Sequence, residues 1–122
     1  MIYLYGHGFY FPRRGLFQLL ILRVLYENPA HGYRIMNEIQ RITSDKYRPE
    51  PGAIYTTLRR METRELLVSE WERKDSGADR RIYRLTTLGI TVLKEGLRMI
   101  KGSIRLMEDL IRFYDRHFDK NE

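Results

Sequence analysis

The sequence predicts a mainly α-helical fold with one small β-hairpin and a long helix towards its C-terminal end. Three observations predict it. Four stretches of the chain indicate helices: the first is apolar nearly all round, and in the other three apolar residues recur at helical spacing. Two short strand-like runs, joined by a cluster of turn residues, lie between the third and fourth stretches. The fourth stretch keeps a seven-residue apolar repeat. With 122 residues, 43% of them apolar, the chain can bury one modest core.

Residues 1–15 are expected to form an arm ahead of the folded domain. The segment holds five aromatic residues, three glycines and a proline, without a sustained period. Its arginines, Arg13 and Arg14, would reach a phosphate or a minor groove in the manner of basic N-terminal arms. Packing of the aromatic residues on a partner subunit is the alternative, and we favour packing or disorder over contact with DNA.

Two helices are expected next. The first, Leu16–Glu27, is apolar nearly all round and therefore predicts a central buried helix, which Asn28 and Pro29 end. The second runs from about Gly32 to Ile42, with His31 in a cap or turn role. A polar turn over residues 43–48 then leads into a third helix.

The third helix should begin sharply near Pro51 or Gly52. Proline suits the first turn of a helix, and the residue before it is pushed towards extended geometry. At 100° per residue, Ile54, Leu58 and Met61 share one face and are expected to be buried. The outer face is small or hydroxylic at first and then basic: Ala53, Thr56, Arg59, Arg60 and Thr63.

That outer face matches a recognition helix in a major groove. Such a helix contacts base edges near its N-terminus and phosphates further along. An amphipathic helix with a solvated arginine face is the alternative, and the neighbouring elements decide between the two. The run 66–74 indicates a strand from Val68 onwards, residues 75–79 form a turn cluster, and Arg80–Leu85 alternates as a second strand.

Basic residues gather near the tip of this hairpin: Arg73, Lys74, Arg80 and Arg81. Three helices followed by a basic hairpin predict a winged helix-turn-helix domain over residues 16–85. Lys74, Arg80 and Arg81 are accordingly expected to face DNA.

Residues 86–122 predict a long dimerisation helix. Thr86 or Thr87 is a plausible N-cap, and the helix should run to about Phe118. Its apolar positions alternate four and three residues apart, which is the seam of a coiled coil. A three-helix core cannot cover such a stripe, and exposed apolar patches mark interfaces. The expected homodimer seam consists of Leu93, Leu97, Ile100, Ile104, Met107, Ile111, Tyr114 and Phe118.

Composition narrows the function classes. The formal net charge of +6 favours a polyanionic partner, nucleic acid first, and the order of helix-turn-helix and wing makes double-stranded DNA the expected one. There is no cysteine, the three histidines are dispersed, and no catalytic motif is present, so we expect no metal, no cofactor and no enzymatic activity. No apolar run is long enough to cross a bilayer, and no signal peptide is recognisable, so a cytoplasmic protein without membrane contact is expected.

Three separated motifs stand out by their order and spacing. They are His31-Gly32-Tyr33, the stretch 49–62 (PEPGAIYTTLRRME) and the stretch 81–89 (RIYRLTTLG). Together they resemble the PadR family of transcriptional regulators over roughly residues 13–90. The resemblance implies a winged-helix homodimer that binds an operator, usually as a repressor. The DNA-facing positions that it implies are Tyr33, Gly52, Ala53, Tyr55, Thr56, Arg59 and Arg60, with Arg80 and Arg81 on the wing.

The resemblance also raises a small-molecule effector. Relatives respond to phenolic acids or bind planar hydrophobic drugs, some of them between tryptophans on the C-terminal helices. The one tryptophan of this chain, Trp71, lies in the hairpin, so that pocket cannot be carried over. Release by a small aromatic or hydrophobic ligand stays compatible with the sequence. A winged-helix module that binds DNA without sequence preference, or that binds another protein, is the alternative function.

Overall fold

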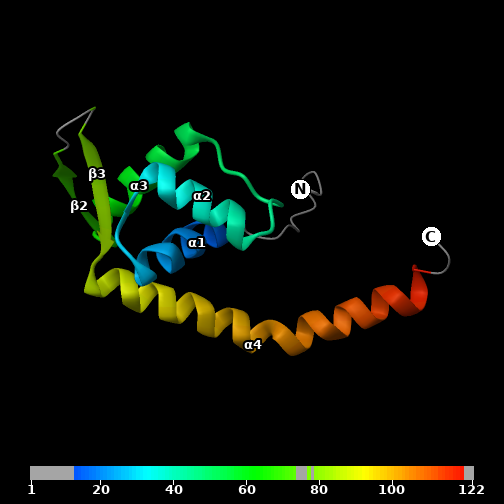
Figure 1. Cartoon of the computed structure of the whole chain (residues 1–122). Coiled ribbons are helices and arrows are strands. Elements are labelled where there is room, and N and C mark those ends of the chain that lie inside the picture. Colours follow the sequence, from blue (N-terminus) through cyan, green and yellow to red (C-terminus); the bar gives the residue numbers. More distant parts are fainter. Residues whose placement is uncertain (1–12, 74–76, 78, 120–122) are drawn as a thin grey trace.

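A computed structural model describes residues 13–73, 77 and 79–119 of the chain (Figure 1). The predicted fold class is confirmed: the described part is mainly helical, with a small sheet and a long helix near the C-terminal end. The element order is α1 (Arg13–Glu27), β1 (Ala30–His31), α2 (Gly32–Ile42), α3 (Pro51–Thr63), β2 (Leu67–Glu72), β3 (Arg80–Leu85) and α4 (Thr87–His117).

The core is centred on α1, which packs against α2, α4 and β3. Ile21 and Leu22 are fully buried there, as the apolar circumference of this helix predicts. Ile54, Leu58 and Met61 of α3 are also completely buried, so the predicted inner face of that helix is confirmed.

The helix boundaries agree closely with the sequence pattern except at the first one. The bounds of α2 are the expected Gly32 and Ile42. For α3, Glu50 adopts an extended backbone at the N-cap and Pro51 opens the helix. In contrast, α1 begins at Arg13, inside the segment expected to be an arm. A single glycine costs a helix only about 1 kcal/mol, so Gly15 does not stop a first turn that buried Phe17 anchors. The rest of the expected arm, residues 1–12, lies outside the described residues.

The sheet has three antiparallel strands in the order β1-β3-β2. The hairpin of β2 and β3 was predicted, and its register pairs Leu67 with Leu85 and Glu72 with Arg80. The remaining strand, β1, was not predicted, because a strand of two residues directly after Pro29 is too short to show an apolar period. It pairs Ala30 with Tyr83 and so ties the start of α2 to the wing.

The start of α4 is locked to the turn between α3 and β2. The Thr86 hydroxyl accepts a hydrogen bond from the Gly89 N–H (2.9 Å) and donates one to the carbonyl oxygen of Glu65 (2.6 Å). Gly89 lies so close to the Leu66 carbonyl oxygen that no side chain fits at this position. Of the two predicted N-caps, Thr86 and Thr87, the structure has Thr86.

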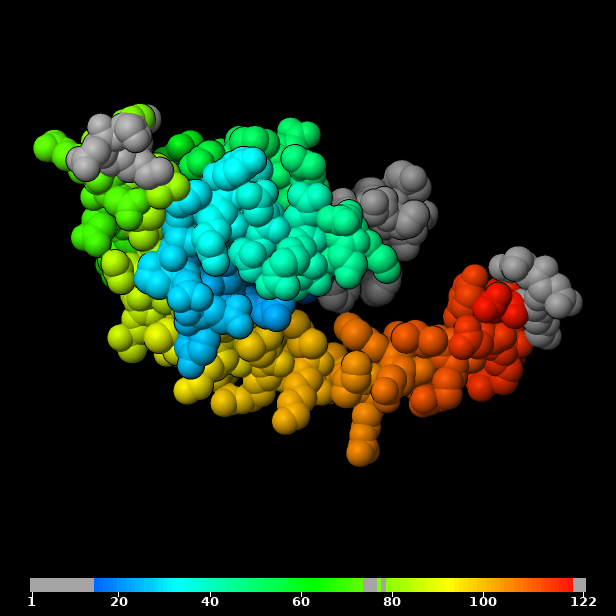
Figure 2. Space-filling model, viewed as in Figure 1, coloured from blue at the N-terminus to red at the C-terminus, as the bar shows by residue number. Residues whose placement is uncertain are grey.

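The two halves of α4 have different surroundings. Gly96 lets the helix approach α1, since a β-carbon there would lie 2.5 Å from a methyl carbon of Leu19. Beyond residue 96 only Ser103 among the described residues of α4 is even partly buried. This part extends away from the winged-helix body (Figures 1 and 2). No helix of the described chain is long and apolar enough to span a membrane.

The long helix also changes direction about its middle (Figure 1). Gly102 and Ser103 lie there, and the Ser103 hydroxyl donates a hydrogen bond to the Met99 carbonyl oxygen one turn earlier (2.9 Å). Glycine–serine pairs and such back-bonded serines are recognised causes of helix bending.

Candidate nucleic-acid interface

The outer face of α3 presents most of the residues that the sequence predicts for DNA contact. Gly52, Ala53, Tyr55, Thr56 and Arg59 are exposed, and Arg60 is partly exposed. No atom from elsewhere in the described chain lies within 4 Å of where a β-carbon on Gly52 would be. The first turn of α3 is therefore open to close approach by a bulky partner. A surface hollow of about 530 Å³ runs beside it and is lined by Phe17, Tyr47, Gly52, Ala53, Thr56, Thr57 and Arg60.

The His31-Gly32-Tyr33 motif has a separate structural reason for each residue. The His31 ring caps α2 by accepting a hydrogen bond from the Arg34 N–H at Nδ1 (3.3 Å). Gly32 makes room for Tyr55, because a β-carbon there would lie 2.6 Å from the tyrosine ring. Tyr33 is 61% exposed at the start of α2. Tyr33 and Tyr55 thus reach the surface from the two helices of the helix-turn-helix.

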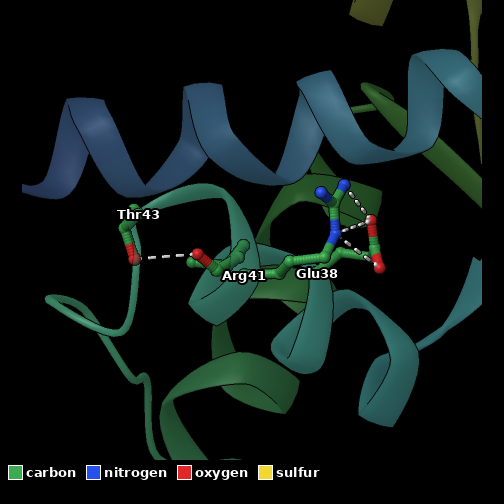
Figure 3. A network of polar contacts seen from close by, with 4 residues as sticks. Glu38, Arg41 and Thr43 are labelled. Carbon is green, nitrogen blue, oxygen red and sulfur yellow. Dashed lines mark hydrogen bonds and ion pairs between the residues drawn. The ribbon is translucent and has the colours of Figure 1, made fainter.

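The turn between these helices is fixed by Thr43. Its hydroxyl donates to the carbonyl oxygen of Ile39 at the end of α2 (2.9 Å) and accepts from the Tyr47 N–H (3.1 Å). The Tyr47 ring in turn stands edge-on to Phe17 of α1, with 5.8 Å between ring centroids. Figure 3 shows Thr43 at the end of α2. These contacts tie the turn to the end of α2 and to α1.

An exposed ion pair joins neighbouring turns of α2, where Arg41 bends back to Glu38 (Figure 3; 2.9 Å). The hydrogen bond from Arg41 holds the pKa of the Glu38 carboxyl below its ordinary value, and the arginine charge adds to this effect. Exposed pairs of this kind stabilise a helix only slightly.

Arg80 and Arg81 are neighbours in the wing, and the same DNA-facing role was predicted for both, but they lie in different surroundings. Both terminal nitrogens of Arg80 are engaged, one with Nε2 of His31 (2.8 Å) and the other with a carboxylate oxygen of Glu72 (3.0 Å). Since a neutral imidazole accepts at only one nitrogen, His31 accepts from Arg80 or from the Arg34 N–H at any one time. Arg81 instead donates through Nε to the Ser69 hydroxyl (2.7 Å) and stacks on Trp71.

A second hollow, of about 440 Å³, lies between α3 and the wing. It is lined by Arg59, Glu62, Thr63, Arg81 and Tyr83. Burial raises the pKa of the Tyr83 hydroxyl above its ordinary value, and the Glu62 carboxylate adds to the rise. A tyrosine phenol is neutral at physiological pH already at its ordinary pKa of 10.0, and this shift opposes its ionisation further. Lys74, also predicted to face DNA, lies outside the described residues.

The predicted seam of α4 is exposed with one exception. Leu93 is only 5% exposed, because it packs into the core of its own chain and is not available to a partner. The other predicted seam residues are all exposed: Leu97, Ile100, Ile104, Met107, Ile111, Tyr114 and Phe118. Periodicity alone could not show that α1 already covers the first turns of this seam.

An apolar hollow that sequence reasoning missed adjoins this seam. It has a volume of about 440 Å³ and lies between α1 and α4. Leu16, Leu19 and Gly96 line it, together with Met99 and Ile100. The sequence did contain an indication of this hollow: α1 is apolar nearly all round, whereas the core of the chain covers only part of its surface. Among the described residues, no group of three or more histidine and acidic side chains is arranged to hold a metal ion.

Comparison with known proteins identifies the family. A family model described as "Transcriptional regulator PadR-like family" matches residues 21–95, which is more than half of the chain. The chain belongs to the PadR-like family of transcriptional regulators. This membership confirms the resemblance seen in the three motifs and agrees with the prediction that the protein is not an enzyme.

Individual PadR-like proteins extend this finding. A transcriptional regulator of Mycobacterium tuberculosis is 38% identical over 93 residues, which are 76% of this chain and 83% of that protein. A crystal structure of a PadR family transcriptional regulator from Eggerthella lenta is similar with a TM-score of 0.68 and 31% identity, covering 81% of this chain and 84% of that one. Bacillus subtilis PadR, solved in complex with operator DNA, has the same fold at 18% identity and a TM-score of 0.62, covering 67% of this chain and 46% of that one.

Proposed function

We propose that this PadR-like protein is a sequence-specific DNA-binding regulator that acts as a homodimer, as a repressor, on an operator of two half-sites. The observation that carries the proposal is the open first turn of α3, together with the arginine-bearing wing beside the second half of the same helix. In this proposal residues 16–85 form the DNA-binding domain and residues 86–122 the dimerisation helix.

The contacts of α3 follow from its exposed face. Gly52, Ala53 and Thr56 carry little bulk, so base edges can approach the first turn closely. Arg59 and Arg60 follow one turn later, where a phosphate or a guanine comes within reach of a guanidinium group. Tyr33 and Tyr55 present hydroxyls to the backbone on either side of the helix-turn-helix. That Bacillus subtilis PadR was solved with operator DNA supports this assignment.

Dimerisation is supported by the uncovered seam of α4. This helix has 31 residues and is about 46 Å long at 1.5 Å per residue. Its second half buries almost nothing within the chain, and an apolar stripe of this length at heptad spacing fits a second copy of itself. Two recognition helices joined in this way would contact half-sites about 34–36 Å apart, one turn of the duplex.

The test is selection of bound sequences from a random duplex pool. We expect enrichment of a site with two related halves, bound at least about a thousandfold more tightly than bulk duplex. A pool without any enriched site, together with equal binding of all competitors, would favour the alternative of a module without sequence preference. Such a module would show a specificity ratio near one at every salt concentration.

A small aromatic or hydrophobic effector is a second part of the proposal. The hollow between α1 and α4 is lined mostly by apolar side chains and adjoins the seam, so a ligand there would touch both the domain and the partner helix. A thermal-shift screen with aromatic compounds tests this part. We expect a hit to raise the melting temperature and to weaken operator binding, whereas hits without any effect on DNA binding would remove the effector from the proposed function.

A further inference from the structure

The chain of contacts Trp71–Arg81–Ser69–Glu62 links the wing to the recognition helix. From it we infer that Arg81 is a preorganised binding residue for a DNA backbone phosphate, while the adjacent Arg80 has a structural role. The inference rests on the proposed DNA binding and names the wing residue that would make the contact.

Arg81 is held on two sides by strand β2. It stands directly across from Trp71 in the β2–β3 register, and its guanidinium carbon lies 4.9 Å from the centre of the indole ring. This is within the range of a cation–π contact. Its Nε donates a hydrogen bond of 2.7 Å to the Ser69 hydroxyl, which fixes the orientation of the guanidinium plane.

The Ser69 hydroxyl is itself oriented by the recognition helix. It donates its single proton to a carboxylate oxygen of Glu62 in α3, at 2.7 Å. Because a serine hydroxyl has only one proton to donate, its lone pairs are left to accept from Arg81. Glu62 and Ser69 are therefore positioning residues, and they couple the direction of Arg81 to the helix that would enter the groove.

This arrangement leaves the terminal amino groups of Arg81 for a ligand. Within the described part of the chain, neither of its Nη atoms makes a hydrogen bond. Two parallel N–H groups on a planar guanidinium match the oxygens of a phosphate in a bidentate contact. Since the side chain is already ordered, binding costs it less conformational entropy than it costs a free arginine.

The position of Arg81 fits a backbone phosphate better than a base edge. The side chain opens onto the hollow between α3 and the wing, and Arg59 lines the same hollow from the α3 side. A duplex strand that passes from the groove contacted by α3 to the wing would cross this hollow with its phosphates. Glu62 also lines it, and the two arginines there outweigh this single carboxylate.

Arg80 offers no such fork. One of its terminal nitrogens lies 2.8 Å from Nε2 of His31, the other donates to a carboxylate oxygen of Glu72, and its Nε is buried without a hydrogen-bond partner in the described chain. Arg80 therefore connects the wing to the start of α2. Adjacent in sequence and identical in charge, the two arginines form a matched pair for an experiment.

The experiment measures binding of the full-length protein to a mixed-sequence duplex at several salt concentrations. Arg81→Gln should weaken binding about tenfold to a hundredfold. It should also reduce the magnitude of the slope of log K against log salt by about 0.9, the value of one lost phosphate contact. Arg80→Gln should leave the slope within about 0.3 of the wild-type value, while lowering the melting temperature.

Two further variants test the positioning. Ser69→Ala should weaken binding about twofold to tenfold without changing the slope, because the charge stays while its orientation is lost. Arg81→Lys should behave similarly, since lysine keeps the charge without the planar fork. In the wild-type protein the emission of Trp71, the sole tryptophan, should change when duplex is added, and Arg81→Gln should reduce this change.

The outcomes separate this inference from the proposed function. Equal slopes for Arg80→Gln and Arg81→Gln, or wild-type affinity for Ser69→Ala, would overturn the inference. Circular dichroism of each variant shows whether a loss of binding comes from unfolding. Because the phosphate contact does not depend on sequence, these measurements keep their meaning even if no operator is enriched. An enriched operator with an unchanged slope for Arg81→Gln would remove the inference alone.

Discussion

The winged-helix body and the second half of α4 are built on opposite principles. In the body a core of apolar side chains is buried, His31 and Thr86 cap α2 and α4, and Gly32 and Gly89 stand where a ring or a carbonyl oxygen approaches closely. The second half of α4 has regular helical geometry and a strong apolar stripe, yet almost nothing within the chain covers it. Isolated helices are only marginally stable in water. The difference teaches that packing within one chain ends near Gly96, and the proposed homodimer would cover the remaining apolar stripe.

The largest effect is expected from a charged residue in the apolar seam of α4, which tests whether a partner covers this part of the helix. Ile104→Asp buries an unpaired carboxylate in the proposed interface and should weaken dimerisation by about 3–5 kcal/mol. We expect a monomer by light scattering at micromolar concentration, together with weaker operator binding. Arg105→Asp, on the adjacent exposed position, is the control and should stay dimeric. A dimer of unchanged mass for Ile104→Asp would place the interface elsewhere.

A substitution that creates a cavity in the core of the winged-helix body should lower the stability of the fold. Leu58 is fully buried in α3, and Leu58→Ala should lower the free energy of unfolding by about 2–5 kcal/mol. Urea denaturation checks this prediction through the midpoint. Leu88→Ala removes a half-exposed side chain at the start of α4 and should cost well under half as much. Similar losses at both positions would contradict the assignment of the core.

Two glycines of α4 should respond with opposite signs. Gly89→Ala pushes a methyl group into the Leu66 carbonyl oxygen and should destabilise the protein by about 1–3 kcal/mol. Gly102 has open space around it within the chain, so Gly102→Ala should stabilise α4 by about 0.5–1 kcal/mol. Thermal unfolding measures both. If Gly102→Ala instead destabilises the protein, the partner chain of the proposed dimer approaches α4 closely at this residue.

The smallest expected effect concerns the exposed ion pair of α2. The folded-state pKa of Glu38 lies below its ordinary value of 4.5, so its contribution is complete above that pH and is lost as the pH falls through the folded pKa. The difference in unfolding free energy between wild type and Glu38→Gln should therefore be small and should shrink below pH 4.5. A difference that stays constant with pH would mean that another property of the side chain causes it.

Local chemistry made much of this fold predictable. Pro51 and Thr86 mark helix starts through their own geometry and hydrogen bonding, and the inner face of α3 follows from its spacing alone. The short strand β1 could not be predicted, because its two residues are defined by pairing with β3.

The site was less predictable for a related reason. The different surroundings of Arg80 and Arg81 depend on cross-strand register and on contacts with residues distant in sequence, such as His31. Similarly, the burial of Leu93 depends on where α1 packs, which no spacing along α4 reports.

The junction at Thr86 has a consequence for the proposed dimer. A single residue separates β3 from α4, and hydrogen bonds to Glu65 and Gly89 clamp it, so the junction has no flexible linker. In such a dimer α4 would hold the winged-helix body at a fixed position relative to the seam. The distance between the two recognition helices would then be set by the point at which the two copies of α4 cross. Inserting one residue between Gly96 and the seam would rotate the two halves by about 100° relative to each other. The operator spacing would then be encoded in the register of α4 and could be changed without touching any residue that meets DNA.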